Sequence, residues 1–324
     1  MPSLDTRDRM LWASDKPLAH ITTPIPPDCA LRKGTGLDKF EEAFPDDQAC
    51  LEHIFAKRYG QGSCCPKCGN PADWISSTVP AVFVSRCCRR LIHPLRGTIF
   101  QRSRRLPLKD WFRGLLIAAN STGTPGPKFY RRYFDLSVKA AVGMANKIRW
   151  QMALQENDRV IGGAGGDIYL SEVSFLRVRR LARTGYKQKR VISLSDGCDV
   201  GFVVPESSLA SHIMRALAPR VRPDAVLHCA NVALYRRLAR CGKGSHTVVR
   251  AGPEFRHAAM RSEISVIIAK RVLRRLYSHV GARHLGVYLN EQSFRANAVR
   301  DRSLFWSAIE AFPAPPASGS FIDG

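Results

Sequence analysis

Two groups of cysteines constrain this chain most strongly. The first group is Cys64-Cys65-Pro-Lys-Cys68-Gly69, and the second is Cys87-Cys88, which follows a strand-like stretch. In a Cys-x-x-Cys pair followed by Gly, two thiolates can face one tetrahedral Zn²⁺ while the backbone turns tightly between them. The pattern therefore predicts a zinc-ribbon-like knuckle.

The second half of the knuckle departs from a complete zinc ribbon. A second Cys-x-x-Cys pair would end at Cys88, but position 85 is serine, whose hydroxyl is a poor substitute for a thiolate. We expect zinc ligands at Cys65, Cys68 and Cys88, with a fourth ligand from Cys87, Cys64 or His93. In the alternative interpretation the knuckle keeps its shape without zinc, and its buried thiols act as small apolar side chains.

Positive charge is the strongest compositional signal. The chain has 50 Lys and Arg against 27 Asp and Glu, a formal net charge of +23. Such an excess indicates a polyanionic partner, here double-stranded DNA, because the cations cluster along the sequence. The alternative is an arginine-rich composition inherited from a GC-rich genome.

Helical periodicity follows the knuckle. We predict a helix over 107–120, a Gly/Pro break, a short helix over 128–134, and a second helix to about Met152 with Ser137 as its N-cap. This pattern is typical of a helix-turn-helix that lays its second helix on DNA. The predicted DNA contacts are the cations Arg102, Arg104, Arg105, Arg131, Arg132, Lys139, Lys147 and Arg149.

The stretch Gly162-Gly-Ala-Gly-Gly166 predicts a flexible linker between domains. Beyond it we predict strands over 167–172, 190–194, 200–204, 225–229 and 246–250, and helices over 207–217, 231–240, 260–277 and 283–297. This alternation favours an α/β domain with a mixed sheet and flanking helices. The predicted organisation is a disordered arm (1–36), a helical lead-in and knuckle (37–100), a helix-turn-helix region (101–161), the linker (162–166), the α/β domain (167–300) and a tail (301–324).

No membrane or export segment is expected. The first residues lack the apolar core of a secretory signal, and no run approaches the roughly 18 apolar residues of a membrane helix. We therefore expect a cytoplasmic chain associated with the nucleoid, with reduced thiols.

The order of these parts resembles the insertion-sequence DDE transposases, whose ribonuclease-H-like catalytic domain follows an N-terminal zinc ribbon and helix-turn-helix. The resemblance covers roughly residues 45–300. It is carried by Cys65-Pro-x-Cys68-Gly, Gly97-Thr-Ile-Phe100, Leu108-x-x-Trp111-Phe112, Lys147-Ile-Arg149 and His284-Leu-x-x-Tyr288-Leu-x-Glu291-x-x-Phe294-Arg295-x-Asn297. It implies a ribonuclease-H-like fold for 167–300, binding to the terminal inverted repeats of a mobile element, and a homodimer on DNA.

The resemblance also implies three carboxylates that hold two Mg²⁺ ions about 3.5–4 Å apart. The two aspartates of the family pattern correspond to Ser171 and Cys229, and only the final acid, Glu263, is retained. At about 4 Å and an effective dielectric near 20, one carboxylate attracts Mg²⁺ by roughly 8 kcal/mol before desolvation. Neither a hydroxyl nor a soft sulfur replaces that attraction.

The sequence therefore predicts a transposase-like DNA-binding protein with impaired catalysis. One alternative is an active Mg²⁺-dependent transposase that uses relocated acids, with candidates at Asp167, Glu172, Asp196, Asp199 and Asp224. The other is a transcriptional regulator that uses only the region 60–150 to bind DNA.

Overall fold

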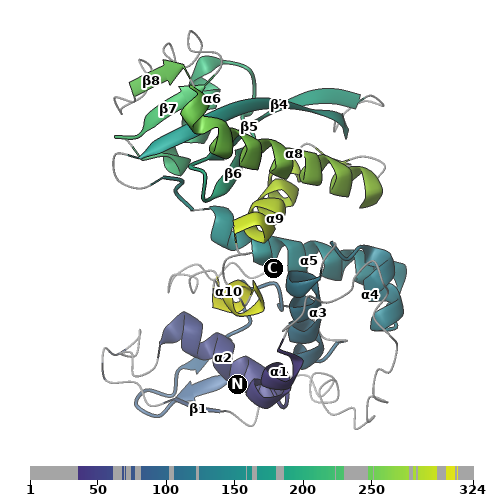
Figure 1. The fold of residues 1–324 in the computed structure, drawn as a ribbon. Helices are drawn as coiled ribbons and strands as arrows, with labels where there is room; N and C mark the ends of the chain where they lie inside the picture. Colours follow the sequence, from purple (N-terminus) through teal and green to yellow (C-terminus); the bar gives the residue numbers. More distant parts are fainter. Residues whose placement is uncertain are drawn as a thin grey trace. The chain divides into compact units, whose positions relative to one another are not determined.

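The computed structural model describes residues 36–60, 68, 70, 74–76, 82–101, 106–121, 124–157, 159–162, 166–179, 186–222, 224–229, 247–250, 252–276, 280–281, 284–297, 304–310 and 312. The chain is a mixed α/β protein that divides into two compact units (Figure 1). The N-terminal unit comprises Met1–Gln151 and Phe305–Gly324, and the sheet unit comprises Met152–Leu304.

The N-terminal unit is built mainly from helices. Two short helices, α1 (Leu37–Ala43) and α2 (Asp47–Tyr59), confirm the prediction for the lead-in. The carboxylate of Asp46 accepts the N–H of Ala49 at 2.8 Å and so caps α2. Helix α3 (Leu108–Asn120) begins directly after Pro107, as predicted, and nearly all of its residues are buried.

A small antiparallel sheet follows α2 in the knuckle region. Its strands are β1 (Trp74–Ser76), β2 (Phe83–Ser85) and β3 (Leu91–Ile92), paired in the order β1-β2-β3. A tight turn joins β2 to β3, with Arg89 in the left-handed region at φ 56°. Its ends are fixed because Ser85 N–H donates to the Arg90 carbonyl and Arg89 N–H donates to the Ser85 carbonyl, both at 2.9 Å.

A helix pair follows α3, as the sequence predicts. Helix α4 (Pro127–Tyr133) ends where Asp135 adopts φ 48° and Leu136 N–H donates to the Arg131 carbonyl at 3.0 Å. Helix α5 (Val138–Asn157) begins after Ser137, whose hydroxyl accepts the N–H of Ala140 at 3.3 Å. Ser137 is thus the N-cap that the sequence predicts, while α5 runs five residues beyond the expected end at Met152.

The expected tail contains a further helix, α10 (Leu304–Glu310). This part of the predicted tail is packed, because Phe305 is buried in the aromatic core of the N-terminal unit. Its ring lies 5.4 Å from that of Phe40 and 6.1 Å from that of Phe44. Phe44 in turn packs edge-on against Phe112 of α3, with ring centroids 4.9 Å apart.

The sheet unit contains a five-stranded mixed sheet in the order β6-β5-β4-β7-β8, and β9 (Val280–Gly281) pairs with the far end of β4. The strands are β4 (Asp167–Arg179), β5 (Tyr186–Ser195), β6 (Val200–Val203), β7 (Val226–Cys229) and β8 (Thr247–Arg250). Strands β4, β5 and β6 pair antiparallel, whereas β7 and β8 run parallel to β4. All five predicted strands are therefore confirmed.

Helices cover both faces of this sheet (Figure 1). Helix α6 (Ala210–Leu217) packs Ile213 and Leu217 into one core, which also holds Ile168 and Leu170 of β4. Helices α8 (Arg256–Leu276) and α9 (Leu285–Asn297) pack on the other face, against side chains such as Val191 and Phe202. Short 3₁₀ turns, Ala218–Arg220 and Pro253–Phe255, follow α6 and precede α8.

Asn297 ends the long motif near the C-terminus and ties α9 to the sheet. Its side chain accepts the N–H of Val200 at 2.8 Å and donates to the Val200 carbonyl at 2.9 Å. It also donates to the fully buried carboxylate of Glu156 at 3.1 Å, and the same carboxylate accepts from Arg159 at 2.9 Å. The motif residue that the resemblance singles out therefore has a structural role.

Some predictions fall outside the described residues. They are the arm over 1–35, the helix over 231–240, the middle of the Gly linker (163–165) and the last residues from 313. Within the described part of the chain, no helix is both long and apolar enough to cross a membrane.

Candidate functional site

The knuckle brings three thiols together. The sulfur atoms of Cys68, Cys87 and Cys88 all lie within 4.8 Å of one another, and the Cys68 and Cys87 sulfurs are 3.2 Å apart. This is the only group of three or more potential metal ligands among the described residues. Cys64 and Cys65 lie outside the described residues, and His93 does not belong to the group.

The three thiols could supply three of the four ligands of a tetrahedral zinc site. With Zn–S bonds of about 2.3 Å, tetrahedral geometry separates two sulfurs by about 3.8 Å. The 3.2 Å between the Cys68 and Cys87 sulfurs would therefore need to widen by about half an ångström to admit the ion. The Ser85 hydroxyl lies within hydrogen-bond distance of the Cys87 sulfur, at 2.8 Å, so the serine at the position where a complete ribbon would have a cysteine contacts a candidate ligand.

The helix pair exposes part of its predicted DNA-binding set. Arg131 and Arg132 are exposed on α4, and Lys128, which does not belong to the predicted set, is exposed on the same face at i, i+3 and i+4 spacing. Lys139 is exposed in the first turn of α5. The only acid between positions 124 and 155 is Asp135, so this stretch of the chain carries a clear excess of positive charge. Arg102, Arg104 and Arg105 lie outside the described residues.

Two predicted DNA contacts are engaged within the protein. Arg149 is only 3% exposed, and its guanidinium donates to the Asn146 carbonyl oxygen at 2.9 Å. In this structure the guanidinium of Arg149 is therefore engaged within the protein, and its contact with phosphate stays a prediction. Lys147 is half-buried, lies 5.3 Å from the centre of the Trp111 ring and donates to the Gln101 carbonyl at 3.1 Å. Burial lowers the pKa of Lys147.

The positions that correspond to the catalytic acids of DDE transposases do not all lie on the same face of the sheet. Ser171 pairs directly with Ser193 of β5, so both side chains point to the same side. The Ser193 hydroxyl lies 2.7 Å from that of Ser262 on α8, which identifies this side as the α8 face. Glu263 follows Ser262 on the same helix, and its side chain is exposed.

Cys229 lies on the opposite face. Its register partner on β4 is Leu170, and both side chains belong to the core beneath α6. Burial and the nearby charge of Glu172 raise the pKa of the Cys229 thiol to about 11, so it stays protonated at neutral pH. The structure thus brings Ser171 and Glu263 to one face but does not bring Cys229 to them.

Different side chains occupy the α8 face next to Ser171. Tyr169 lies there, and burial together with the nearby charge of Glu263 raises its pKa. His228 of β7 also lies on this face, because it is the register partner of Tyr169. The sequence analysis missed His228, although the alternation of side chains along a strand assigns it and Cys229 to opposite faces.

The relocated acids are already engaged in structural contacts. Asp167 accepts from His228 Nε2 at 2.8 Å, and the His228 ring stacks on Phe255. Asp196 accepts the N–H groups of Cys198 and Asp199 at 2.8 and 2.6 Å, which closes the turn between β5 and β6. Three further acids complete the predicted set: Asp199 pairs with Arg159 at 3.0 Å, Glu172 lies 3.5 Å from Arg190, and Asp224 is exposed.

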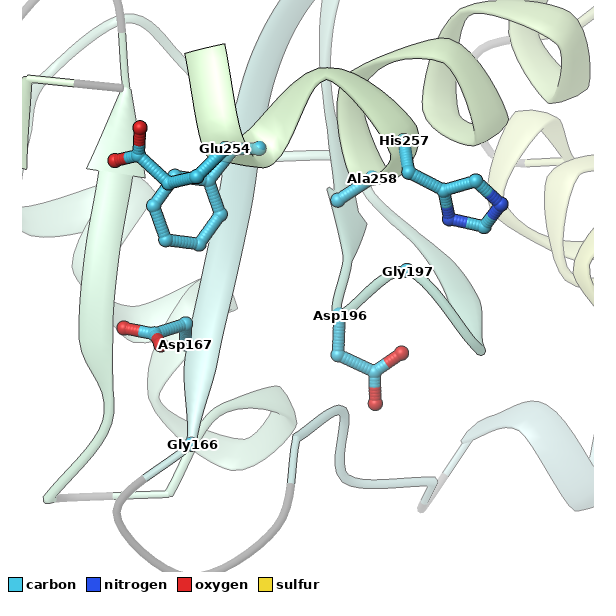
Figure 2. A pocket seen from close by; sticks show the side chains of 8 residues that line it. Gly166, Asp167, Asp196, Gly197, Glu254, His257 and Ala258 are labelled. Carbon is cyan, nitrogen blue, oxygen red and sulfur yellow. The ribbon is translucent and has the colours of Figure 1, made fainter. Parts of the chain in front are cut away.

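A pocket of about 420 Å³ lies beside these acids. It is lined by Gly166, Asp167, Asp196, Gly197, Glu254, Phe255, His257 and Ala258. Figure 2 shows the carboxylates of Asp167 and Asp196 pointing away from each other, and that of Glu254 pointing in a third direction. These side chains therefore do not converge on one ion.

Magnesium does not fit the α8 face. The ion needs several oxygen ligands, preferably from carboxylates. Of the three family positions only Glu263 carries a carboxylate, and no cluster of acids with metal-ligand spacing occurs in the portion of the chain that the structure describes. Two-metal chemistry depends on such a cluster, so none of its steps can be assigned to these residues.

No protein-family model matches the sequence, and no curated protein matches it significantly.

Proposed function

We propose that this chain is a DNA-binding protein related to insertion-sequence DDE transposases, with a ribonuclease-H-like domain that no longer cuts or joins DNA strands. The proposal rests on three parts of the molecule: the topology of the sheet, the chemistry of its α8 face, and the charge of the helix pair.

The topology of the sheet unit supports the proposed fold. Its first three strands form an antiparallel meander, and the next two strands run parallel to the first on its other side. A long helix, α8, then packs on one face of the sheet. A ribonuclease-H-like domain has this strand order, with its first strand in the centre and its last acid on such a helix.

The proposed loss of catalytic activity is supported mainly by the hydrogen bond between Ser193 and Ser262. Both side chains are completely buried, and their oxygens are 2.7 Å apart beside Ser171 and Glu263. The region that would need several carboxylates contains neutral hydroxyls instead. A hydroxyl supplies little of the charge that holds Mg²⁺, so this face favours a protein that retains its fold without its metal.

The exposed cations of the helix pair support DNA binding. Lys128, Arg131, Arg132 and Lys139 are exposed close together in sequence, next to a single acid. Contacts between Lys or Arg side chains and the phosphate backbone of DNA supply most of the non-specific affinity of DNA-binding proteins. The knuckle would contribute structurally, with Zn²⁺ held by Cys68, Cys87 and Cys88 and a fourth ligand. The proposed target is the terminal inverted repeat of the element that encodes the chain.

The experiment compares binding of duplex DNA carrying the gene's flanking repeats by the full chain and by Arg131→Ala/Arg132→Ala. We expect the slope of log affinity against log salt concentration to fall by about 0.9 for each phosphate that the variant no longer neutralises. The matched control is Arg271→Ala/Arg274→Ala, which removes two exposed arginines from α8. Equal binding by both double variants, or no salt-dependent binding by the wild type, would contradict the proposal.

A further inference from the structure

Helix α5 has an exposed face with an unusual composition. Val138 is 60% exposed, Val142 is 40% exposed and Trp150 is 36% exposed, and they recur at intervals of four or eight residues. Asn146 lies four residues after Val142 and four before Trp150, and it is also exposed. On a helical wheel Asn146 lies near the centre of the face, between Val142 and Trp150. Lys139 adds a positive charge beside them.

A hydrogen bond from Arg149 fixes the side chain of Asn146. The buried guanidinium of Arg149 donates to its carbonyl oxygen at 2.9 Å. This bond uses one of the two lone pairs of the oxygen and neither of the amide N–H bonds. The carboxamide can therefore still offer a donor and an acceptor to a partner, in an orientation that is fixed before binding.

Gly143 lies on the same face, one turn before Asn146. A methyl group at this position would meet no heavy atom within 4 Å. Gly114 on α3 differs, because a methyl group there would lie 2.4 Å from the end of the Met144 side chain. Close packing thus explains why position 114 is glycine, whereas position 143 has room for a larger side chain. Glycine weakens a helix relative to alanine, and one common reason for it is close approach of the backbone to a ligand.

We propose that α5 reads A·T base pairs in the major groove of DNA, with Asn146 paired to adenine and the backbone at Gly143 close to the groove. The inference rests on the proposed DNA binding by the helix pair and deepens it. An asparagine carboxamide matches the adenine N6 and N7 edge, and apolar side chains such as Val138 and Val142 contact the thymine methyl group. In this proposal Arg149 orients the side chain of Asn146 and does not itself contact DNA.

Charge distinguishes DNA from a protein as the occupant of this face. An apolar helical face also suits a protein partner, but here Lys139 lies on it, and Lys128, Arg131 and Arg132 are exposed on the helix that directly precedes it in the chain. The duplex presents negative phosphates on both sides of the groove that would receive the helix. This arrangement favours DNA over a second copy of a chain with the same positive charge.

The test selects bound duplexes from a pool with a random centre of about 20 base pairs, using the full chain. The wild type should enrich a site with at least one A·T pair whose replacement by G·C lowers affinity about tenfold. Asn146→Ala should remove most of this discrimination and keep the affinity for random duplex and its salt slope. Gly143→Ala should weaken binding to the selected site at least about threefold while the midpoint of thermal unfolding stays equal or rises.

Gly286→Ala is the matched control, because that glycine also lies in a helix and a methyl group there would meet no atom within 4 Å. It should leave DNA binding unchanged. The inference is overturned if Asn146→Ala keeps the base preference or if Gly143→Ala binds as the wild type does. It is also overturned, with the proposed function intact, if the wild type binds DNA without an A·T preference. If the wild type binds no duplex, both fail together.

Discussion

The hydroxyl of Ser193 on β5 lies 2.7 Å from the hydroxyl of Ser262 on α8, and both side chains are fully buried. The pair joins the sheet to the helix that carries Glu263. If the proposed ribonuclease-H-like fold is correct, this neutral hydrogen bond lies in the region where a metal-dependent nuclease needs negative charge.

The serine pair should be energetically coupled. Ser193→Ala or Ser262→Ala leaves a buried hydroxyl without its partner, so each single change should lower the free energy of unfolding by about 1–2 kcal/mol. Removing both hydroxyls should cost clearly less than the sum of the two single changes. Urea denaturation of the four proteins in this cycle measures the coupling. Additive effects would show that the hydrogen bond contributes nothing.

Asn297 should be essential for the stability of the sheet unit. Asn297→Ala removes two bonds to the Val200 backbone and one to Glu156, all of them buried. Each buried polar group left without a partner costs about 1–3 kcal/mol, so a total loss of roughly 3 kcal/mol is expected from chemical denaturation. A loss below about 1 kcal/mol would show that water or a neighbour replaces the amide.

Glu156 should make stability depend on pH. Burial raises its pKa above the ordinary value of 4.5, and this outweighs the opposing effect of Arg159 and Arg220. Between 4.5 and the raised value the folded chain binds more protons than the unfolded chain, so the free energy of unfolding falls as the pH rises. Denaturation of the wild type and Glu156→Gln across this window should give a difference that grows with pH in favour of the variant. A constant difference would contradict the raised pKa.

The knuckle should bind one Zn²⁺ per chain. Cys68→Ser or Cys87→Ser should reduce the zinc content measured by atomic absorption to near zero, because each removes a thiolate ligand. Cys198→Ser is the control, since Cys198 is exposed and lies outside the thiol group. Chelation should also destabilise the knuckle, as in other structural zinc sites. Full zinc content in the Cys87→Ser variant would remove Cys87 from the ligand set.

Local patterns in the sequence predicted most of the described elements. The five strands, the N-cap at Ser137 and the helices on either side of it follow from side-chain alternation, capping chemistry and helical spacing. The helix around Phe305 was missed because a proline-rich stretch follows it directly. Its burial depends on aromatic partners such as Phe40 and Phe112, which are far away in the sequence.

The functional residues were harder to predict than the fold. The sequence shows that Arg149 is charged, but only packing shows that it is buried and bound to Asn146. Motif spacing assigned an aspartate position to Cys229, whereas the register of β4 and β7 turns that side chain toward α6. Charge and spacing are local properties, while exposure and strand face depend on the whole fold.

A strand-cleavage assay tests the central claim most directly. The full chain is incubated with Mg²⁺ or Mn²⁺ and a duplex carrying the gene's own flanking repeats, beside Glu263→Gln. We predict that both proteins bind the duplex and that neither cuts it. Ser171 and Cys229 occupy two of the three positions that correspond to metal-binding acids, and the side chains next to Ser171 include the neutral hydroxyls of Ser193 and Ser262. Metal-dependent cleavage by the wild type that disappears in Glu263→Gln would contradict the account.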